Sequence, residues 1–473
     1  MTVHQSITEK ALVTNLAKGI YGTFAEIGAG QEVVRQFFHA GNASGTIAKA
    51  MSAYDKSFSD DIYGKETRYV CESRLRKMLS HEMDLLTSRL DESRGADTRF
   101  FSYANTVTTD PSRGGHAWMG ISFQLTPRSQ VNTIFLHVRL QDLDRISQQE
   151  TIGIIGVNLV HGAFHLHSDP MALIEALGDH ILHHKIDIDM IRFEGESFKD
   201  VDHRQMCLHL VRKKLAKATM FSPSGETLQP AEILYKKNLL VQRGFFRPVT
   251  TVNADMCRSA LEQFCKDRDL EEDSVVTIME LTLNNLVTGH DQGNTGVKDF
   301  LDRATLLQEM GHHVLVSNYP EYYLLSRFLN TLTSGHIAMV IGTPRLLDIF
   351  DNRYYEHVDG GILEAIGKLF RNNTHIYAYP WLSQDGKLMS AYNLGVSREL
   401  EGLYRYLLDN DFISPLDNYA PELPRLRLTS ERVLERIQSN DPSWMKLVPE
   451  AVAKTICEEG LFDVKNCSEL TTS

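Results

Sequence analysis

The stretch NLLVQRGFFRPVTTVNADM, residues 238–256, determines how we interpret the rest of the chain. Asn238 to Val241 has the apolar composition of a short buried strand, and a helix is expected from about Ala254. Polar and glycine residues fill the loop between these two elements. They are Arg243, Gly244, Arg247, Thr250, Thr251 and Asn253.

This loop combines two guanidinium groups, a glycine turn and a helix N-terminus. Free N–H groups and the positive end of the helix dipole attract phosphate or carboxylate, and arginine adds bidentate hydrogen bonds. The sequence therefore predicts a loop that binds a small-molecule anion. The residues expected to bind it are Arg243, Gly244, Arg247, Thr250 and Asn253.

Length and composition are those of an ordinary globular protein. The 473 residues are 42% hydrophobic and 23% charged, and this length favours two domains with extensions. The net charge of −12 argues against nucleic acid as a partner. The longest apolar runs, such as residues 151–160, are too short to cross a bilayer, so no membrane partner is expected.

The cysteines and the N-terminal residues indicate a cytoplasmic protein. The six cysteines are scattered without a CxxC pair, which indicates neither a zinc knuckle nor a disulfide framework, and reduced thiols are expected. MTVHQSITEK at the N-terminus lacks the basic and apolar regions of a secretory signal.

Strand-like and helix-like segments alternate over most of the chain. Aromatic and β-branched runs at residues 98–109, 116–127 and 132–142, joined by turn compositions, predict an antiparallel meander. From residue 132 onward the strand-like runs are apolar without alternation, as in parallel strands buried on both faces. They lie at residues 134–140, 186–193, 218–222, 238–244, 275–282, 312–318, 336–342 and 374–380.

This alternation predicts an α/β fold with two mostly parallel open sheets and helices on both faces. A (β/α)8-like barrel with an N-terminal extension is the alternative. Long amphipathic helices are expected at residues 67–93, 297–311 and 321–332. The expected segments are an N-terminal α+β region (1–130), a first α/β half (131–245), a second half (246–400) and a helical extension (401–473).

Ligands of α/β proteins bind at the carboxyl ends of parallel strands, where this sequence places many polar residues. Glu280 ends an apolar strand, so burial would raise its pKa unless Arg243 or a metal compensates. It is expected to be a general base or a Mg²⁺ ligand, with Glu194 as a second catalytic carboxylate. The alternative is a buried Glu280 that is paired with one arginine. Further substrate-binding candidates at strand ends are Asn284 and Asn318; Glu321 and Arg345 also stand there.

Two glycine signals point to further phosphate loops. Gly28 to Gly30 lies between a strand-like and a helix-like run, although the third glycine of a dinucleotide fingerprint is missing. Gly360 and Gly361 open a helix whose N–H groups can hold a phosphate. The alternative in both places is a tight turn, with Asp359 capping the second helix.

Other catalytic signatures are weak or absent. His161 and His165 have the i, i+4 spacing that can chelate Zn²⁺, but no glutamate stands between them as the metalloprotease motif requires. No resident metal site is assigned. GxSxG and GxxxxGK[ST] are both missing, which disfavours serine hydrolases and P-loop NTPases.

Five stretches of the chain stand out together. They are TIGIIGVNLVHGAFHLH, VDHRQMCLHLV, LQPAEILYKKNLLVQRGFFRPVT, MELTLNNL and DGGILEAIGKLF. In combination they resemble a poorly characterised bacterial family, whose members often carry automatically assigned names of the nicotinate- or nicotinamide-nucleotide adenylyltransferase type. The resemblance spans about residues 22–412 and implies a phosphorylated or nucleotide-like ligand. The GxFxPxHxGH-like loop and ISSTxxR-like helix start of true adenylyltransferases are missing, so no catalytic residue is carried over.

The residues and the resemblance lead to two hypotheses. The first is a cytoplasmic enzyme that binds a phosphorylated or nucleotide-like small molecule, with nucleotidyl- or phosphoryl-type transfer as the reaction considered. The second is a non-catalytic assembly or regulatory protein on an α/β scaffold. The sequence identifies no cofactor beyond the Mg²⁺ option, and it leaves a homo-oligomer open.

Overall fold

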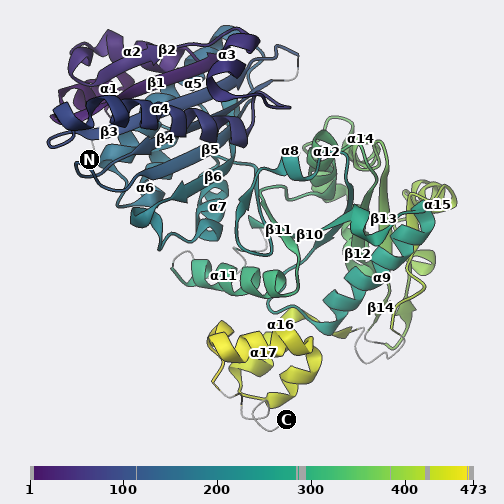
Figure 1. Cartoon of the computed structure of the whole chain (residues 1–473). Helices are drawn as coiled ribbons and strands as arrows, with labels where there is room; N and C mark the ends of the chain where they lie inside the picture. The colour runs from purple at the N-terminus through teal and green to yellow at the C-terminus, as the bar shows by residue number, and fades with distance from the viewer. Residues whose placement is uncertain are drawn as a thin grey trace. The chain divides into compact units, whose positions relative to one another are not determined.

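The computed structural model of this chain describes residues 5–112, 114–283, 286, 294–383, 385–420, 427–465 and 467 (Figure 1). The chain divides into two compact units, Met1–Thr219 and Met220–Ser473. Each unit is built around its own sheet, and the two are described separately.

The first unit contains a six-stranded sheet with the order β2-β1-β3-β4-β5-β6. β1 pairs parallel with β2 and β3, and β3 to β6 form a continuous antiparallel meander. The meander expected from residue 98 is therefore confirmed. The strands are β1 (Ile20–Gly28), β2 (Ile47–Met51), β3 (Arg99–Thr108), β4 (Gly115–Phe123), β5 (Asn132–Leu140) and β6 (Ile186–Glu194).

The predicted direction of β6 is wrong. The sequence predicts a parallel strand at residues 186–193, and it places residues 134–140 both in the antiparallel meander and among the parallel-type runs. In the structure, β5 and β6 pair antiparallel with each other. Both strands are buried along most of their length because helices cover both faces of the sheet. Continuous burial removes the polar alternation whichever way the neighbouring strand runs, so it does not report strand direction.

Helices α4 and α5 provide most of the cover over this sheet. α4 buries Leu75, Met78 and Leu79 against Trp118 and Phe135 of the sheet. α5 packs with α1 and α2 and also contacts β4. The helices of this unit are α1 (Ile7–Leu16), α2 (Glu32–Ala40), α3 (Lys56–Tyr63), α4 (Glu72–Arg94), α5 (Arg145–His165), α6 (Pro170–Leu177) and α7 (His203–Arg212).

The second unit contains an eight-stranded sheet with the order β16-β13-β12-β9-β10-β11-β7-β8. Strands β9 to β13 and β16 pair in parallel. The described sheet is open, with β16 and β8 at its edges, so the barrel alternative is wrong. The strands are β7 (Ala218–Phe221), β8 (Thr227–Leu228), β9 (Asn238–Arg243), β10 (Val275–Thr282), β11 (His313–Ser317), β12 (Ile337–Gly342), β13 (Thr374–Tyr379) and β16 (Ile413–Pro415).

β9 is the first strand of the parallel part of this sheet in chain order, and later parallel strands lie on both sides of it. The chain runs from β9 to β10 and β11 on one side and then returns to β12, β13 and β16 on the other. Counted from β9, the spatial order is 3-2-1-4-5-6, which is the doubly wound order of dinucleotide-binding folds. The stretch that follows β9 therefore stands at the topological switch point, where such folds bind ligands.

Helices connect the parallel strands and cover the sheet (Figure 1). α9 contacts both β9 and β12, and α11 contacts β11. A short hairpin, β14 (Trp381–Leu382) and β15 (Leu388–Met389), follows β13. The helices are α8 (Pro230–Ile233), α9 (Thr251–Arg268), α11 (Asn294–Glu309), α12 (Tyr322–Leu332), α13 (Thr343–Ile349), α14 (Gly361–Leu369), α15 (Glu401–Asp409), α16 (Ser430–Gln438) and α17 (Glu450–Glu459).

Short 3-10 helices lie between the main elements. They are η1 (Ala43–Gly45), η2 (His183–Lys185), η3 (Glu196–Phe198), η4 (Glu272–Ser274), η5 (Asn352–Tyr355), η6 (Ala391–Asn393), η8 (Pro442–Leu447) and η9 (Leu461–Asp463). Within the described residues, no helix is both long and apolar enough to pass through a membrane.

The two compact units differ from the expected segmentation of the chain. The boundary expected at residue 130 falls between β4 and β5, which are hydrogen-bonded neighbours. The boundary expected at residue 245 follows β9 directly, in the middle of the second sheet. Composition alone does not separate a hairpin turn from a linker between domains, because both are rich in glycine, proline and polar residues.

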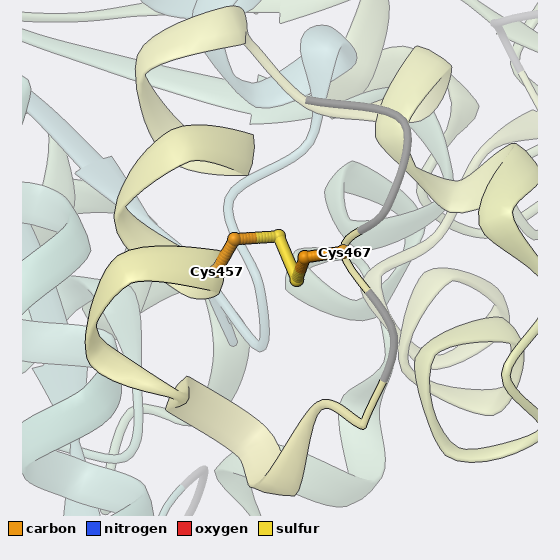
Figure 2. Close-up of a disulfide and its surroundings, with 2 residues drawn as sticks. All are labelled: Cys457 and Cys467. Carbon is orange, nitrogen blue, oxygen red and sulfur yellow. A yellow bond between two sulfur atoms is a disulfide. The ribbon is translucent and has the colours of Figure 1, made fainter. Parts of the chain in front are cut away.

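One pair of cysteines is bonded, contrary to the expectation of reduced thiols throughout. Cys457 of α17 forms a disulfide with Cys467, with a Cα–Cα distance of 5.7 Å (Figure 2). Cys71, Cys207 and Cys257 are free and buried. The spacing of Cys457 and Cys467 matches no motif, and only the turn of the chain after α17 brings the two thiols together.

Candidate functional site

A cavity of about 300 Å³ lies at the carboxyl ends of β9, β10 and β11 in the second unit. The loop after β9, the start of α12 and helix α13 complete its walls. Its lining residues are Arg243, Gly244, Phe245, Thr282, Pro320, Glu321, Tyr322, Arg345, Asp348, Ile349, Tyr354 and Tyr355. It therefore occupies the switch-point edge of the sheet, where the strand order predicts a ligand.

A buried ion pair between Arg243 and Glu280 forms the base of this region. Nε of Arg243 lies 2.6 Å from Oε2 of Glu280, and Nη2 lies 3.3 Å from Oε1. The two residues are directly opposite each other on β9 and β10. Ser317 of β11 donates a further hydrogen bond to Oε1. Both carboxylate oxygens of Glu280 are thus occupied by the protein itself.

The remaining contacts of Arg243 hold it in a fixed position. Its Nη1 and Nη2 atoms donate to the carbonyl oxygens of Pro320 and Tyr319, each at 2.7 Å. Its guanidinium lies over the ring of Tyr322, 4.6 Å from the centroid. Burial works against its charge, but the charge and hydrogen bonds of Glu280, together with Tyr322 and Glu321, raise the pKa of Arg243 above its ordinary value. Arg243 therefore lines the cavity as a charged side chain, and each of its three guanidinium nitrogens already donates to a protein oxygen.

Two other lining side chains have buried oxygen atoms without a hydrogen-bond partner among the described residues. They are Oγ1 of Thr282, at the end of β10, and Oε2 of Glu321, which precedes α12. Thr282 is only 3% exposed, and the Glu321 side chain is 18% exposed. The other oxygen of Glu321 lies 4.0 Å from Nε2 of His357.

The loop after β9 does not offer the groups that the sequence predicted for an anion. The guanidinium of Arg247 pairs with Asp299, which also binds Arg303. Thr250 and Asn253 form a capping box at the N-terminus of α9, in which each side chain accepts the backbone N–H of the other residue. Of the loop residues that were predicted to bind the anion, only Arg243 and Gly244 line the cavity.

The other predicted site residues are dispersed. Asn318 is exposed after β11, and Asn284 lies outside the described residues. The N–H of Gly360 donates to Glu364 at 2.8 Å, so a carboxylate from α14 itself occupies the position expected for a phosphate beside Gly361. Glu194 belongs to the first unit.

Glu194 forms an ion pair at the end of β6. It binds Arg76 through two hydrogen bonds, of 2.9 and 2.5 Å. Its hydrogen bonds with Arg76 lower its pKa. A carboxylate held in its ionised form by an arginine on a half-exposed surface is a weak proton donor. The geometry thus gives Glu194 the role of a surface ion pair.

The glycine turn after β1 is also filled by the protein itself. Glu26 accepts the N–H groups of Val33 and Val34 at the start of α2, at 3.0 and 3.3 Å. A Cβ atom at Gly30 would lie 2.0 Å from Oδ1 of Asn105. This turn therefore has the tight-turn role that was the alternative to phosphate binding.

The rings of His161 and His165 lie side by side on α5, with centroids 4.6 Å apart and a tilt of 32° between their planes. Burial lowers the pKa of His161 to about 4. Among the residues that the structure describes, no group of three or more histidine, cysteine, aspartate or glutamate side chains is arranged to hold a metal ion.

The sequence indicated some lining residues of the cavity and missed others. Arg345 and Glu321 belong to the polar residues at strand ends, and both line the cavity. Thr282, Tyr322, Tyr354 and Tyr355 were not predicted. Tyr354 and Tyr355 lie in η5, well after the end of β12, where no local pattern relates them to the strands.

Comparisons with known proteins leave the family open. No protein-family model and no curated protein matches the chain, so the resemblance to adenylyltransferase-named proteins stays a prediction. A solved structure of the competence/damage-inducible protein CihA from Agrobacterium tumefaciens is 16% identical with a TM-score of 0.23, covering 34% of this chain and 97% of that chain. A solved structure of the competence or damage-inducible protein from Enterobacter asburiae is 13% identical, with a TM-score of 0.24. That match covers 34% of this chain and 98% of that chain.

Proposed function

We propose that the second unit binds a small phosphorylated or nucleotide-like molecule in the cavity beside Arg243. The observation that carries this proposal is the pair of unpartnered buried oxygens of Thr282 and Glu321. Buried polar atoms in folded proteins almost always have hydrogen-bond partners, so two unpartnered oxygens on residues that line one cavity favour a ligand that supplies the missing bonds. An ionised carboxylate only accepts hydrogen bonds, and sugar hydroxyls are suitable donors.

The aromatic lining supports a ligand with a planar ring. Phe245, Tyr322, Tyr354 and Tyr355 all contribute to the cavity wall. Aromatic side chains stack on planar ligand rings, as they do on nucleobases. A base or pyridine ring against these residues accounts for the apolar part of the lining.

Arg345 is the side chain that we assign to a phosphate group. Its Nη1 atom binds Asp348 at 3.1 Å, and the side chain is 63% exposed. The Nε and Nη2 atoms therefore remain available for bidentate binding of an oxyanion. Arg243 lacks this freedom because Glu280 and two carbonyl groups use its donors.

The size of the cavity favours a mononucleotide over a dinucleotide. At about 300 Å³ it stands at the small end of the range for small-molecule sites. The strand order is shared with dinucleotide-binding folds, but the fold does not determine the ligand. If the site transfers a nucleotidyl or phosphoryl group, Glu321 has the free carboxylate oxygen that a proton acceptor needs, whereas Glu280 does not.

A thermal-shift and calorimetric screen of the full chain tests this proposal. The panel contains nucleoside monophosphates, pyridine mononucleotides and sugar phosphates. We expect at least one nucleoside or pyridine mononucleotide to stabilise the protein, and Thr282→Val and Glu321→Gln to weaken its binding about tenfold each. Glu262→Gln, a 50% exposed position outside the cavity, is the matched control.

Two results would count against this function. One is that no compound in the panel stabilises the chain, which favours the non-catalytic assembly or regulatory hypothesis. The other is that Thr282→Val and Glu321→Gln bind the ligand as tightly as Glu262→Gln does, which places the ligand elsewhere.

A further inference from the structure

The second unit contains another cavity, of about 290 Å³, beside the N-terminal half of α9. Thr251, Asp255 and Arg258 of α9 line it, and their spacing of i, i+4 and i+7 places all three on one face of the helix. Tyr379, the last residue of β13, lines it as well. None of these four residues lines the cavity beside Arg243, so the two cavities are distinct.

Asp255 carries a fixed negative charge in the wall of this cavity. Its Oδ2 atom accepts the hydroxyl of Tyr379 at 2.6 Å and the backbone N–H of Ala420 at 3.0 Å, and its Oδ1 atom accepts Nη2 of Arg258 at 2.6 Å. Burial works against the charge, but these hydrogen bonds lower the pKa of Asp255. An ionised carboxylate has about four acceptor positions, so Asp255, with a side chain that is 14% exposed, can accept one more hydrogen bond.

Arg258 does not neutralise this face of α9. Its guanidinium pairs with both Asp255 and Glu262, and the distance from Nη1 to Oε1 of Glu262 is 2.7 Å. One positive and two negative charges leave a net charge of −1 on these three side chains. A ligand group that meets Asp255 is therefore favoured when it donates hydrogen bonds and carries a positive charge, and an ammonium group does both.

Thr251 offers the opposite kind of contact, one helical turn before Asp255. Its Oγ1 atom is buried and has no hydrogen-bond partner among the described residues, which favours a ligand that supplies the missing bond. Thr251 and Val252 are the first two residues of α9, and their backbone N–H groups have no acceptor within the helix or elsewhere in the described part of the chain. A hydroxyl and two N–H donors at the positive end of the helix dipole favour a carboxylate.

The rest of the cavity wall is apolar. Val252, Ala254, Ala420 and Pro449 line it without adding a charge. The part of a ligand that lies against these residues is therefore expected to be apolar, because its burial is then favourable. The cavity combines a carboxylate, a group of donors one helical turn away and an apolar wall.

We propose that this cavity binds a free α-amino acid with an apolar side chain. The ammonium group donates to Asp255, and the carboxylate accepts from the Thr251 hydroxyl and from the N–H groups at the start of α9. The side chain of the ligand lies against the apolar wall. Positions i and i+4 of a helix have Cβ atoms about 5–6 Å apart, a distance that one small zwitterion spans. The proposal does not depend on the function of the cavity beside Arg243.

The first test uses the unmodified full-length chain and isothermal calorimetry. Leucine, methionine and phenylalanine are titrated, each with two analogues: its amide, which lacks the carboxylate, and its deaminated acid, which lacks the ammonium group. We expect at least one of the three amino acids to bind saturably and both of its analogues to bind at least tenfold more weakly, because each analogue leaves one charged or polar partner unpaired.

Two results of these titrations would overturn the proposal. One is that none of the three amino acids binds. The other is that the amide or the deaminated acid binds as tightly as its parent, because the ligand is then recognised by one charged group alone. Neither result requires a variant of the protein to fold.

Two variants locate the site. Thr251→Val keeps the shape of the side chain and removes a hydroxyl that has no protein partner, so the variant is expected to fold and to bind the amino acid at least tenfold more weakly. Thr331→Val is the matched control on α12, where the hydroxyl donates to the carbonyl oxygen of Phe328 at 2.7 Å, and it should change the affinity less than twofold. Equal affinities of the two variants would overturn the assignment of the ligand to this cavity.

Discussion

Arg243 and Glu280 form an ion pair of 2.6 Å between adjacent strands, with side-chain exposures of 8% and 0%. A buried charge that loses its partner is strongly destabilising, whereas removal of both charges costs much less. The pair therefore fixes the walls of the cavity beside it, and its own groups are not available for chemistry.

The first prediction concerns this pair. Glu280→Gln and Arg243→Met are each expected to lower the free energy of unfolding by about 3–5 kcal/mol. The double variant should lose clearly less than the sum of the two. Denaturant unfolding of the four proteins measures this, and additive losses would show that the two groups are not coupled.

The second prediction concerns the pH dependence of the first unit. Burial raises the pKa of Glu26 to about 8, despite the hydrogen bonds from Val33 and Val34. The folded state thus holds a proton that the unfolded state releases near pH 4.5. The contribution of Glu26 to stability is therefore most favourable below pH 4.5 and is lost progressively as the pH rises from 4.5 to 8.

Glu26→Gln should remove this dependence, because glutamine does not titrate. At about 1.4 kcal/mol per pKa unit, the wild-type chain should lose a few kcal/mol relative to the variant as the pH rises from 4.5 to 8. Thermal unfolding of both proteins across this range measures the difference. A constant difference in stability at all these pH values would contradict the prediction.

The third prediction separates capping from ligand binding at Thr250. Because its side chain accepts the N–H of Asn253 at 3.2 Å, Thr250→Ala should lower the free energy of unfolding by about 1 kcal/mol. The affinity for the mononucleotide that stabilises the wild-type chain should stay within twofold. A tenfold loss of affinity would restore Thr250 to the site that the sequence predicted.

The fourth prediction uses two glycines of the first unit. A methyl group at Gly30 meets the side chain of Asn105, whereas one at Gly45 meets no atom within 4 Å. Gly30→Ala is expected to cost about 1–3 kcal/mol through overpacking, and Gly45→Ala should be nearly neutral. Equal effects of the two substitutions on the melting temperature would mean that the close approach of Gly30 and Asn105 is not needed.

The strands were the best-predicted part of the fold. The runs at residues 238–244, 275–282 and 336–342 each match an observed strand within a residue or two. Apolar runs between turn residues are a local property, so they can be found without a structure. The direction of β6 was missed because buried runs look alike in parallel and antiparallel sheets.

Part of the candidate site could also be predicted, because polar residues at strand ends are a local property of the sequence. The sequence selected Arg243, Gly244 and Arg345 as residues at strand ends, and all three line the cavity. Whether a polar side chain is free depends on partners that are distant in the sequence. No local pattern reports the pairing of Arg247 with Asp299. The pairing of Glu280 with Arg243 was one of two alternatives that the sequence left open, and only the structure decides it.

The sequence by itself determined the α/β alternation, the strand positions and the polar character of the strand ends, because these follow from local periodicity. Only the tertiary structure decided that residues 238–256 contribute Arg243 to a cavity wall while Thr250 and Asn253 cap α9. The physical reason is that hydrogen bonds and ion pairs form between groups that folding brings together. Those contacts determine which polar atoms of the chain stay available to a ligand.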